Sequence, residues 1–223
     1  MEKSRLFAQQ LLKWFSKNRR DFPWRETKDP FKVLIAEILL RKTDARKVLS
    51  VYEHFVRRYS SIEALINAND GQLENSLRPL GLYRRRAKEL RDLAQMVANE
   101  YGGEIPRSRE ELLGLPGVGD YIANAVLCFS FGEDVPLLDT NVIRVVARAF
   151  SFKSEKKRVR DDPKMWQMVH RIVPKGRARN FNLAVLDLAA KVCLPRKPKC
   201  AICPANLICD YASNTTAGRV GAC

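Results

Sequence analysis

The sequence predicts an all-α protein, and three observations support that fold class. Apolar residues recur at helical spacing, as in Leu6, Phe7, Leu11, Trp14 and Phe15. Alternating apolar and polar residues, which are typical of a half-buried strand, are nearly absent. Hydrophobic residues make up 46% of the 223 residues, which is enough for a packed core. We therefore expect one large helical domain or two small ones.

Helix signals follow one another along the N-terminal half. The first helix is expected from Ser4 to about Lys17. Asp29 before Pro30 is typical of an N-cap followed by the first helical position, and a second helix should begin there. Gly81 is expected to break the pattern before a long helix. Further helices are predicted over residues 46–59, 61–68, 71–77 and 84–101.

The C-terminal half continues the helical pattern. Ser108 and Glu111 fit a capping box that opens a short helix ending near Gly114. The basic loop 153–160 is the most linker-like segment, with a solvated connection as the alternative, and residues 212–223 should be a poorly ordered polar tail. Other helices are predicted over residues 120–131, after Asp139, from Asp162-Pro163 and over 180–192.

The charge balance indicates a polyanionic partner. Lysine and arginine number 40 against 25 acidic residues, for a net charge of +15. This excess argues against an acidic or cation-binding protein and favours nucleic acid. The side chains expected to contact phosphates, or alternatively to form solvated helix faces, are Arg84, Arg85, Arg86, Arg196, Lys197 and Lys199.

Apolar segments are too short for a membrane span. Residues 33–40 and 121–131 are interrupted by Glu37 and Asn124 and are shorter than the ~20 apolar residues required. The N-terminus does not resemble a secretory signal. We therefore expect a reducing cytosol, where cysteines serve as ligands or buried thiols rather than disulfides.

Four cysteines form the strongest local motif. Cys193, Cys200, Cys203 and Cys209 have the spacing C-x6-C-x2-C-x5-C. Four soft thiolates at such close range favour a 4Fe-4S cluster, with structural zinc as the alternative. Zinc modules more often contain two CxxC pairs, and only one occurs here. Cys128 is expected to be an ordinary buried thiol, and Cys223 has no evident role.

Three further features suggest ligand binding or catalysis. The turn Leu115-Pro116-Gly117-Val118-Gly119 lies between two predicted helices, where Gly117 and Gly119 could let the backbone approach a phosphate or could simply form the turn. Asp139 is expected at a helix N-cap, either as a cap alone or as an anion that stabilises an oxocarbenium ion. Glu37 is the only charge within residues 33–40, which predicts either partial burial with a raised pKa or a structural ion pair.

Taken together, these motifs resemble the helix-hairpin-helix (HhH-GPD) DNA glycosylases of base excision repair. The segments Phe22-Pro23-Trp24, residues 36–40 and Leu186-Asp187-Leu188 are similar to the branch of adenine glycosylases and G/T-mismatch thymine glycosylases. The resemblance covers about residues 20–209. It implies a six-helix barrel subdomain with the hairpin at 24–133, an iron-sulfur subdomain formed by 1–23 plus 134–223, and an active site in the cleft between them.

The resemblance also implies a role for individual residues. Asp139 would be the catalytic aspartate, Gly117 and Gly119 the phosphate-binding hairpin, and Cys193, Cys200, Cys203 and Cys209 the ligands of a structural 4Fe-4S cluster. Arg196 and Lys197 would contact DNA from the cluster loop. Glu37 and Tyr121 would hold the leaving base, while Leu82 and Arg41 or Lys42 would fill the gap left in the base stack.

Tyr121 favours a monofunctional enzyme that removes thymine. The bifunctional endonuclease III branch has a Schiff-base lysine at this position, and a phenol cannot form an imine. Adenine glycosylases usually have serine there, whereas the thymine branch has tyrosine. Arg41-Lys42 stands where adenine glycosylases have a glutamine pair, and Leu82 where they have tyrosine. Glu37 matches both branches.

The sequence thus predicts a mismatch-specific glycosylase that hydrolytically removes thymine or uracil opposite guanine from double-stranded DNA, without efficient lyase activity. Two alternatives stay open: an adenine glycosylase acting opposite guanine or 8-oxoguanine, and a non-catalytic iron-sulfur module that binds mismatched DNA. We expect a monomer, with no membrane association, in the nucleoid-associated cytoplasm of a prokaryote.

Overall fold

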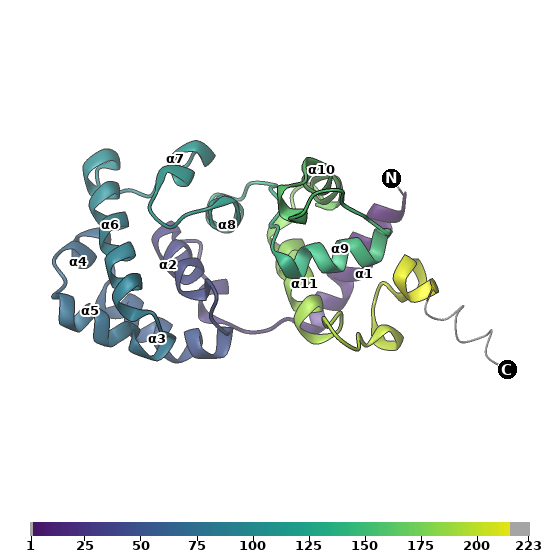
Figure 1. Ribbon diagram of the computed structural model, residues 1–223, viewed down its shortest axis with the longest axis horizontal. Coiled ribbons are helices and arrows are strands. Elements are labelled where there is room, and N and C mark those ends of the chain that lie inside the picture. Colours follow the sequence, from purple (N-terminus) through teal and green to yellow (C-terminus); the bar gives the residue numbers. More distant parts are fainter. Residues whose placement is uncertain (1, 215–223) are drawn as a thin grey trace. The chain divides into compact units, whose positions relative to one another are not determined.

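The computed structural model describes residues 2–214, and these confirm the all-α prediction (Figure 1). No strand occurs among the described residues. The helices are α1 (Glu2–Asn18), α2 (Pro30–Leu40), α3 (Ala45–Arg58), α4 (Ile62–Ile66), α5 (Asp70–Leu77), α6 (Tyr83–Tyr101), α7 (Arg109–Gly114), α8 (Asp120–Phe129), α9 (Thr140–Phe150), α10 (Pro163–Ile172) and α11 (Ala178–Lys191). Short 3-10 turns, η1 to η5, lie at Pro23–Arg25, Arg78–Leu80, Val159–Asp161, Cys200–Ile202 and Asn206–Ile208.

Local capping explains where several helices begin. The Asp29 side chain accepts hydrogen bonds from two backbone N–H groups of α2, and Pro30 is its first residue. Ser108 and Glu111 form the expected capping box at α7. Asp139 caps α9 in the same way as Asp29, and Asp162 caps α10 by accepting from the backbone N–H of Lys164. Each cap satisfies donors that a helix end leaves without an intrahelical partner.

The chain folds into two compact units. The hairpin unit comprises residues 21–131, and the cysteine unit comprises residues up to 20 together with those from 132 onward. The bounds expected from the sequence are 24–133 for the first subdomain and 1–23 plus 134–223 for the second. The two units are described separately below.

In the hairpin unit, α2 is the central helix. Almost every side chain between Phe31 and Leu39 is buried, and Leu34, Ile35 and Leu39 have no exposed surface. This helix packs against α3 and α8, while α6 packs against α4 and α5. A helix that is apolar on nearly all sides must be surrounded by others, which accounts for its largely hydrophobic sequence.

In the cysteine unit, the N-terminal helix packs against the C-terminal part of the chain. Helix α1 contacts α10 and α11, and α9 contacts α11. The Phe7 ring packs edge-on against Phe150 and Phe181, with centroid distances of 5.3 and 6.4 Å. At the end of α1, Arg20 Nε donates to the fully buried carboxylate of Asp187 at 2.5 Å. These contacts join residues more than 140 positions apart into one core.

The two segments expected to be irregular differ in outcome. Most of the basic loop 153–160 is exposed, as in the solvated alternative, but the linker interpretation was wrong. The basic loop 153–160 does not connect the units but lies within the cysteine unit, where Ser154 Oγ donates to Asp162 at 2.6 Å and Trp166 Nε1 donates to the carbonyl of Arg160 at 2.7 Å. In the expected tail, residues 212–214 are helical and Ala212 is buried; the rest of the tail, including Cys223, lies outside the described residues. Within residues 2–214, no helix is long and apolar enough to cross a bilayer.

Candidate functional site

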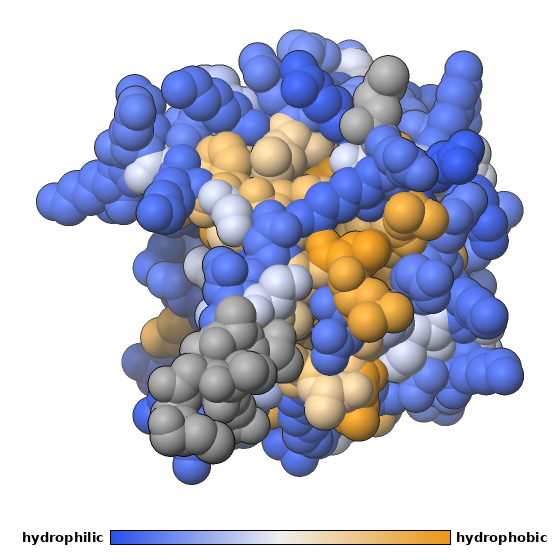
Figure 2. Space-filling view, turned by 90° about the vertical axis from the view of Figure 1, so that its right-hand side faces the viewer, coloured by the Kyte–Doolittle hydropathy of each residue, from blue (hydrophilic) through white to orange (hydrophobic). Residues whose placement is uncertain are grey.

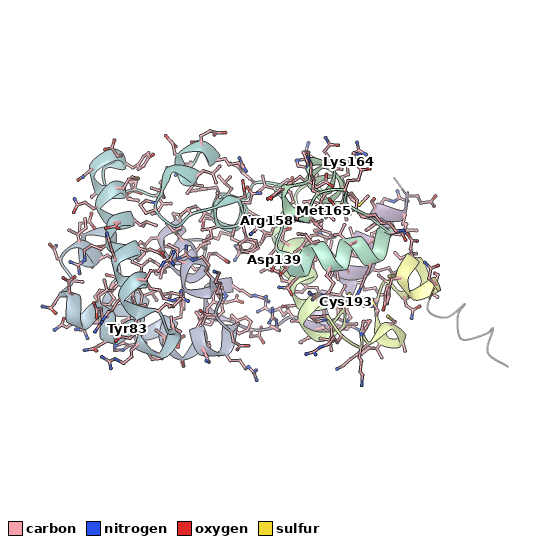
Figure 3. The ribbon with its side chains drawn as sticks, in the orientation of Figure 1. Tyr83, Asp139, Arg158, Lys164, Met165 and Cys193 are labelled. Carbon is pink, nitrogen blue, oxygen red and sulfur yellow. The ribbon has the colours of Figure 1, made fainter. Side chains whose placement is uncertain are left out.

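Asp139 is the N-cap of α9 in the cysteine unit, as the sequence predicted (Figure 3). Its Oδ1 accepts hydrogen bonds from the backbone N–H groups of Asn141 at 2.9 Å and Val142 at 2.8 Å. Its Oδ2 accepts one from the Asn141 side chain at 2.7 Å. The carboxylate is half-buried. These three donors hold the carboxylate in a fixed orientation at the N-terminal end of the helix dipole.

Sequence reasoning missed the residues that orient Asp139. The Asn141 Oδ1 accepts a hydrogen bond from Arg144 Nη1 at 3.1 Å. The same guanidinium donates to the carbonyls of Cys193 at 2.9 Å and Ala189 at 3.1 Å. A chain of hydrogen bonds therefore runs from the Asp139 carboxylate to the backbone of Cys193, the first residue of the cysteine motif. An arginine inside the largely apolar sequence of α9 was the available signal.

The four motif cysteines line a single cavity of about 30 Å³. None of the described cysteines forms a disulfide, and Cys128 is buried elsewhere, as expected. Burial, together with the charges of the three other motif cysteines, raises the pKa of Cys203 to about 11. Burial is also the main cause of the raised pKa of Cys200. Without a bound cation, the thiols of Cys200 and Cys203 are therefore favoured in their protonated form.

Arg148 of α9, which the sequence analysis also missed, supports this cysteine loop (residues 193–209). It donates to the carbonyls of Leu194 at 2.7 Å and Pro195 at 2.9 Å, and to the sulfur of Cys193 at 3.4 Å. Within residues 2–214, no three His, Cys, Asp or Glu side chains are arranged to hold one metal ion.

The cysteine loop presents both charged and apolar side chains. Arg196, Lys197 and Lys199 are exposed, and Lys197 has a left-handed backbone with φ of 52°. The apolar side chains of Ile202 and Leu207 are 66% and 96% exposed. On the face drawn in Figure 2, hydrophobic side chains gather among hydrophilic ones. Because Arg196, Lys197 and Lys199 are exposed, they are available for phosphate contacts.

In the hairpin unit, the glycine turn joins α7 to α8. Leu115 and Val118 are buried and anchor the turn, whereas Gly117 and Gly119 are exposed. Gly117 has φ of +78°, a left-handed conformation that favours glycine. Gly119 is the exposed N-cap of α8 and provides no side-chain cap for the start of that helix. This arrangement can bind an anion such as a DNA phosphate.

Glu37 and Tyr121 also belong to the hairpin unit. Glu37 is only 7% exposed, in agreement with the burial expected from its apolar surroundings. Its position near the middle of α2 places a carboxyl group among hydrophobic side chains. Tyr121 is half-buried in the first turn of α8, two residues after Gly119. The phenol is therefore close in sequence to the glycine turn.

The three candidates for filling a base-stack gap differ in their surroundings. Leu82 is 68% exposed and has φ of 52°. Lys42 is exposed, with φ of 56°. Arg41 instead forms an ion pair with Glu89 and donates from Nη1 to the carbonyl of Gly117 at 3.0 Å. The geometry favours Leu82 and Lys42 as protruding side chains and gives Arg41 a contact with the glycine turn.

Arg86 was wrongly grouped with the surface cations. It is 4% exposed, and its guanidinium donates to backbone carbonyls within the hairpin unit. A charged group at a helical position can be buried when carbonyl acceptors surround it, which a charge count along the sequence does not reveal. Arg84 and Arg85 are exposed, and they form ion pairs with Glu74 and Glu89, respectively.

Comparison with known families identifies the class of protein. Residues 35–168 match the family described as HhH-GPD superfamily base excision DNA repair protein. The chain therefore belongs to this family, in agreement with the resemblance drawn from its motifs. The matched range contains the glycine turn, Glu37, Tyr121 and Asp139.

Particular relatives narrow the comparison. The chain is 48% identical over 219 residues to a thymine-DNA glycosylase of Aeropyrum pernix, covering 96% of this chain and 98% of the relative. It is 39% identical to a thymine/uracil-DNA glycosylase of Methanothermobacter thermautotrophicus, covering 94% and 95%. An adenine DNA glycosylase of Mycobacterium tuberculosis is 37% identical, and the match covers 87% of this chain but 64% of that protein.

Solved structures support the same fold. A thermostable thymine-DNA glycosylase superimposes with a TM-score of 0.91 at 38% identity, covering 96% of this chain and 98% of the other. Endonuclease III in a non-covalent complex with DNA superimposes with a TM-score of 0.83 at 26% identity, covering 97% and 98%.

Proposed function

We propose that this protein is a monofunctional mismatch-specific DNA glycosylase that removes thymine or uracil opposite guanine and leaves an abasic site. The carboxylate of Asp139, held by three donors at the start of α9, carries this proposal. The identities to thymine and thymine/uracil glycosylases support the choice of base. Double-stranded DNA containing a mismatched base is the proposed partner of a monomeric protein in a prokaryotic cytoplasm.

The reaction begins with binding and extrusion of the nucleotide. Lys197, Arg196 and the backbone N–H groups after Gly119 bind phosphates through charge and hydrogen bonds, so the affinity falls as salt rises. Leu82 and Lys42 fill the space that the extruded nucleotide leaves. A mismatched base requires less unstacking energy than a paired one, which contributes to selectivity.

Bond cleavage relies on electrostatic stabilisation. As the N-glycosidic bond breaks, positive charge develops on the deoxyribose, and the fixed carboxylate of Asp139 stabilises it. Water then adds to the sugar. Glu37 and Tyr121 hold the departing base, and Glu37 provides a hydrogen bond or proton. The Tyr121 phenol cannot form a Schiff base, so strand cleavage by lyase chemistry is inefficient.

We also propose that Cys193, Cys200, Cys203 and Cys209 hold a 4Fe-4S cluster. The donor set fits, because four free thiols line one cavity and a guanidinium lies against the sulfur of Cys193. Zinc modules more often contain two CxxC pairs, whereas this motif contains one, which favours the cluster. When bound, the cluster acts as a structural crosslink and favours the thiolate forms. It thereby fixes the loop that carries Arg196 and Lys197.

A panel of duplexes tests the substrate directly. Purified protein is incubated with G·T, G·U, A·G and A·8-oxoguanine duplexes, and the free base is measured by chromatography. Release of thymine and uracil alone supports the proposal. Release of adenine would make the protein an adenine glycosylase. Tight binding to mismatched duplexes without release of any base would make it a non-catalytic DNA-binding module.

A further inference from the structure

Two exposed residues of the hairpin unit have a strained backbone. Lys42 follows the C-terminus of α2 and Leu82 precedes α6, and both adopt left-handed conformations with φ of 56° and 52°. For residues other than glycine, this conformation costs roughly 1–2 kcal/mol each. Neither side chain packs in the core, since Leu82 is 68% exposed and Lys42 is exposed. Other contacts must therefore hold the two turns in place.

The buried guanidinium of Arg86 supplies these contacts. Its Nε donates to the carbonyl of Gly81, the residue before Leu82, at 3.1 Å. Its Nη2 donates to the carbonyl of Arg41 at 3.0 Å and to Thr43 Oγ1 at 2.5 Å, which are the residues on either side of Lys42. One side chain therefore joins the two turns that carry the exposed residues.

The Arg86 guanidinium also forms hydrogen bonds with the C-terminal end of α2. Arg86 Nη1 donates to the carbonyls of Ile38 at 3.1 Å and Leu39 at 3.4 Å in the last turn of α2. A positive charge at the C-terminal end of a helix also interacts favourably with the helix dipole. Only arginine presents five N–H donors in one rigid plane. A lysine at this position could therefore donate hydrogen bonds to one of the two turns but not to both.

We propose that Arg86 is a positioning residue for nucleotide extrusion. It fixes the backbone at both Lys42 and Leu82, so that the two side chains are held in position to enter the base stack. This inference rests on the proposed function, because it assigns the two side chains the task of filling the vacated space. Arg86 itself is buried and touches neither the base nor the sugar.

Double-mutant cycles test the proposal. Arg86→Lys is made in the wild-type protein and in a Lys42→Ala/Leu82→Ala background, and single-turnover release of uracil from a G·U duplex is normalised to the active fraction. We expect Arg86→Lys to slow release about tenfold in the wild-type background and less than about threefold in the second, because coupled residues are non-additive. Equal fold losses in both backgrounds would overturn the proposal.

A second readout separates positioning from mere stability. A 2-aminopurine base placed beside the mismatch becomes fluorescent when it is unstacked, so its amplitude reports extrusion without requiring bond cleavage. Arg86→Lys should reduce this amplitude, whereas the matched control Arg91→Lys should not. Arg91 lies on the same helix, donates to the carbonyl of Ala68 and forms an ion pair with Asp70. An unchanged amplitude in Arg86→Lys would refute the positioning role.

Thr43→Val provides a milder variant if Arg86→Lys does not fold. It removes one acceptor of the guanidinium while retaining the side-chain shape, and it should lower the aminopurine amplitude in the same direction. An amplitude equal to that of the wild type would contradict the proposal. If the wild type released no base from any duplex, the proposed glycosylase function would fail; release with additive losses would refute only the role of Arg86.

Discussion

Gly117→Ala perturbs the glycine turn at the residue whose conformation requires glycine. The backbone of Gly117 is left-handed, with φ of +78°, a conformation that residues with a Cβ rarely adopt. The Cβ of an alanine at this position would lie 3.1 Å from Arg41 Nη1. The Arg41 guanidinium could not move away freely, because it also forms the ion pair with Glu89. The substitution therefore combines backbone strain with a tight contact.

The expected loss of stability follows from these two terms. A left-handed alanine costs roughly 1–2 kcal/mol, and for a chain of this length each kcal/mol shifts Tm by about 2–4 °C. We expect Tm to fall by about 2–8 °C in thermal unfolding followed by circular dichroism. An unchanged Tm would refute the assignment of a strained left-handed turn.

Gly119→Ala is the matched control for stability and the critical variant for DNA binding. Its φ is −115°, and no atom lies within 4 Å of an added Cβ, so we expect no loss of Tm. A methyl group would nevertheless keep a phosphate away from the adjoining N–H groups. Loss of one charge-assisted hydrogen bond, about 1.5 kcal/mol, should weaken duplex binding about tenfold in fluorescence anisotropy. Wild-type affinity in Gly119→Ala would refute phosphate binding by this turn.

Three other substitutions test separate parts of the account. Asp139→Asn keeps an N-capping oxygen but removes the charge, so base release should fall at least ~100-fold while Tm changes little; near wild-type activity would exclude the catalytic role. Burial raises the pKa of Glu89, but hydrogen bonds from Arg85 and Arg41 outweigh it and lower the pKa below 4.5. The carboxylate therefore stabilises the fold at neutral pH, and this contribution is lost as the pH falls through the lowered pKa. Glu89→Gln should have a lower Tm than the wild type at pH 7, with the difference shrinking below pH 4.5, and a constant difference would contradict this. Cys203→Ser should lose iron and absorbance near ~400 nm, and a full iron content would argue against Cys203 as a ligand.

Features that depend on neighbouring residues could be predicted from the sequence. The caps at Asp29, Ser108 and Asp139 were found because a helix start is set by side chains within three residues of it. The burial of Glu37 followed from its uninterrupted apolar surroundings. The cysteine motif was recognisable because its four members lie within seventeen residues.

Features that depend on distant partners could not be predicted. Arg86 looks like one of three surface arginines, and only the fold brings it to carbonyls more than forty residues away. Arg41 resembles a protruding cation, yet its contact with Gly117 spans 76 residues. Arg144 acts similarly, because it joins Asn141 to the carbonyl of Cys193. Such long-range hydrogen bonds leave no periodic pattern.

The most direct test of the central claim is the fate of a G·T duplex labelled on the thymine-containing strand. After incubation with the wild-type protein, we expect free thymine in solution and a labelled strand that stays intact until alkali cleaves it at the abasic site. Intact thymine in the duplex, or strand cleavage at the same extent without alkali, would contradict a monofunctional thymine glycosylase.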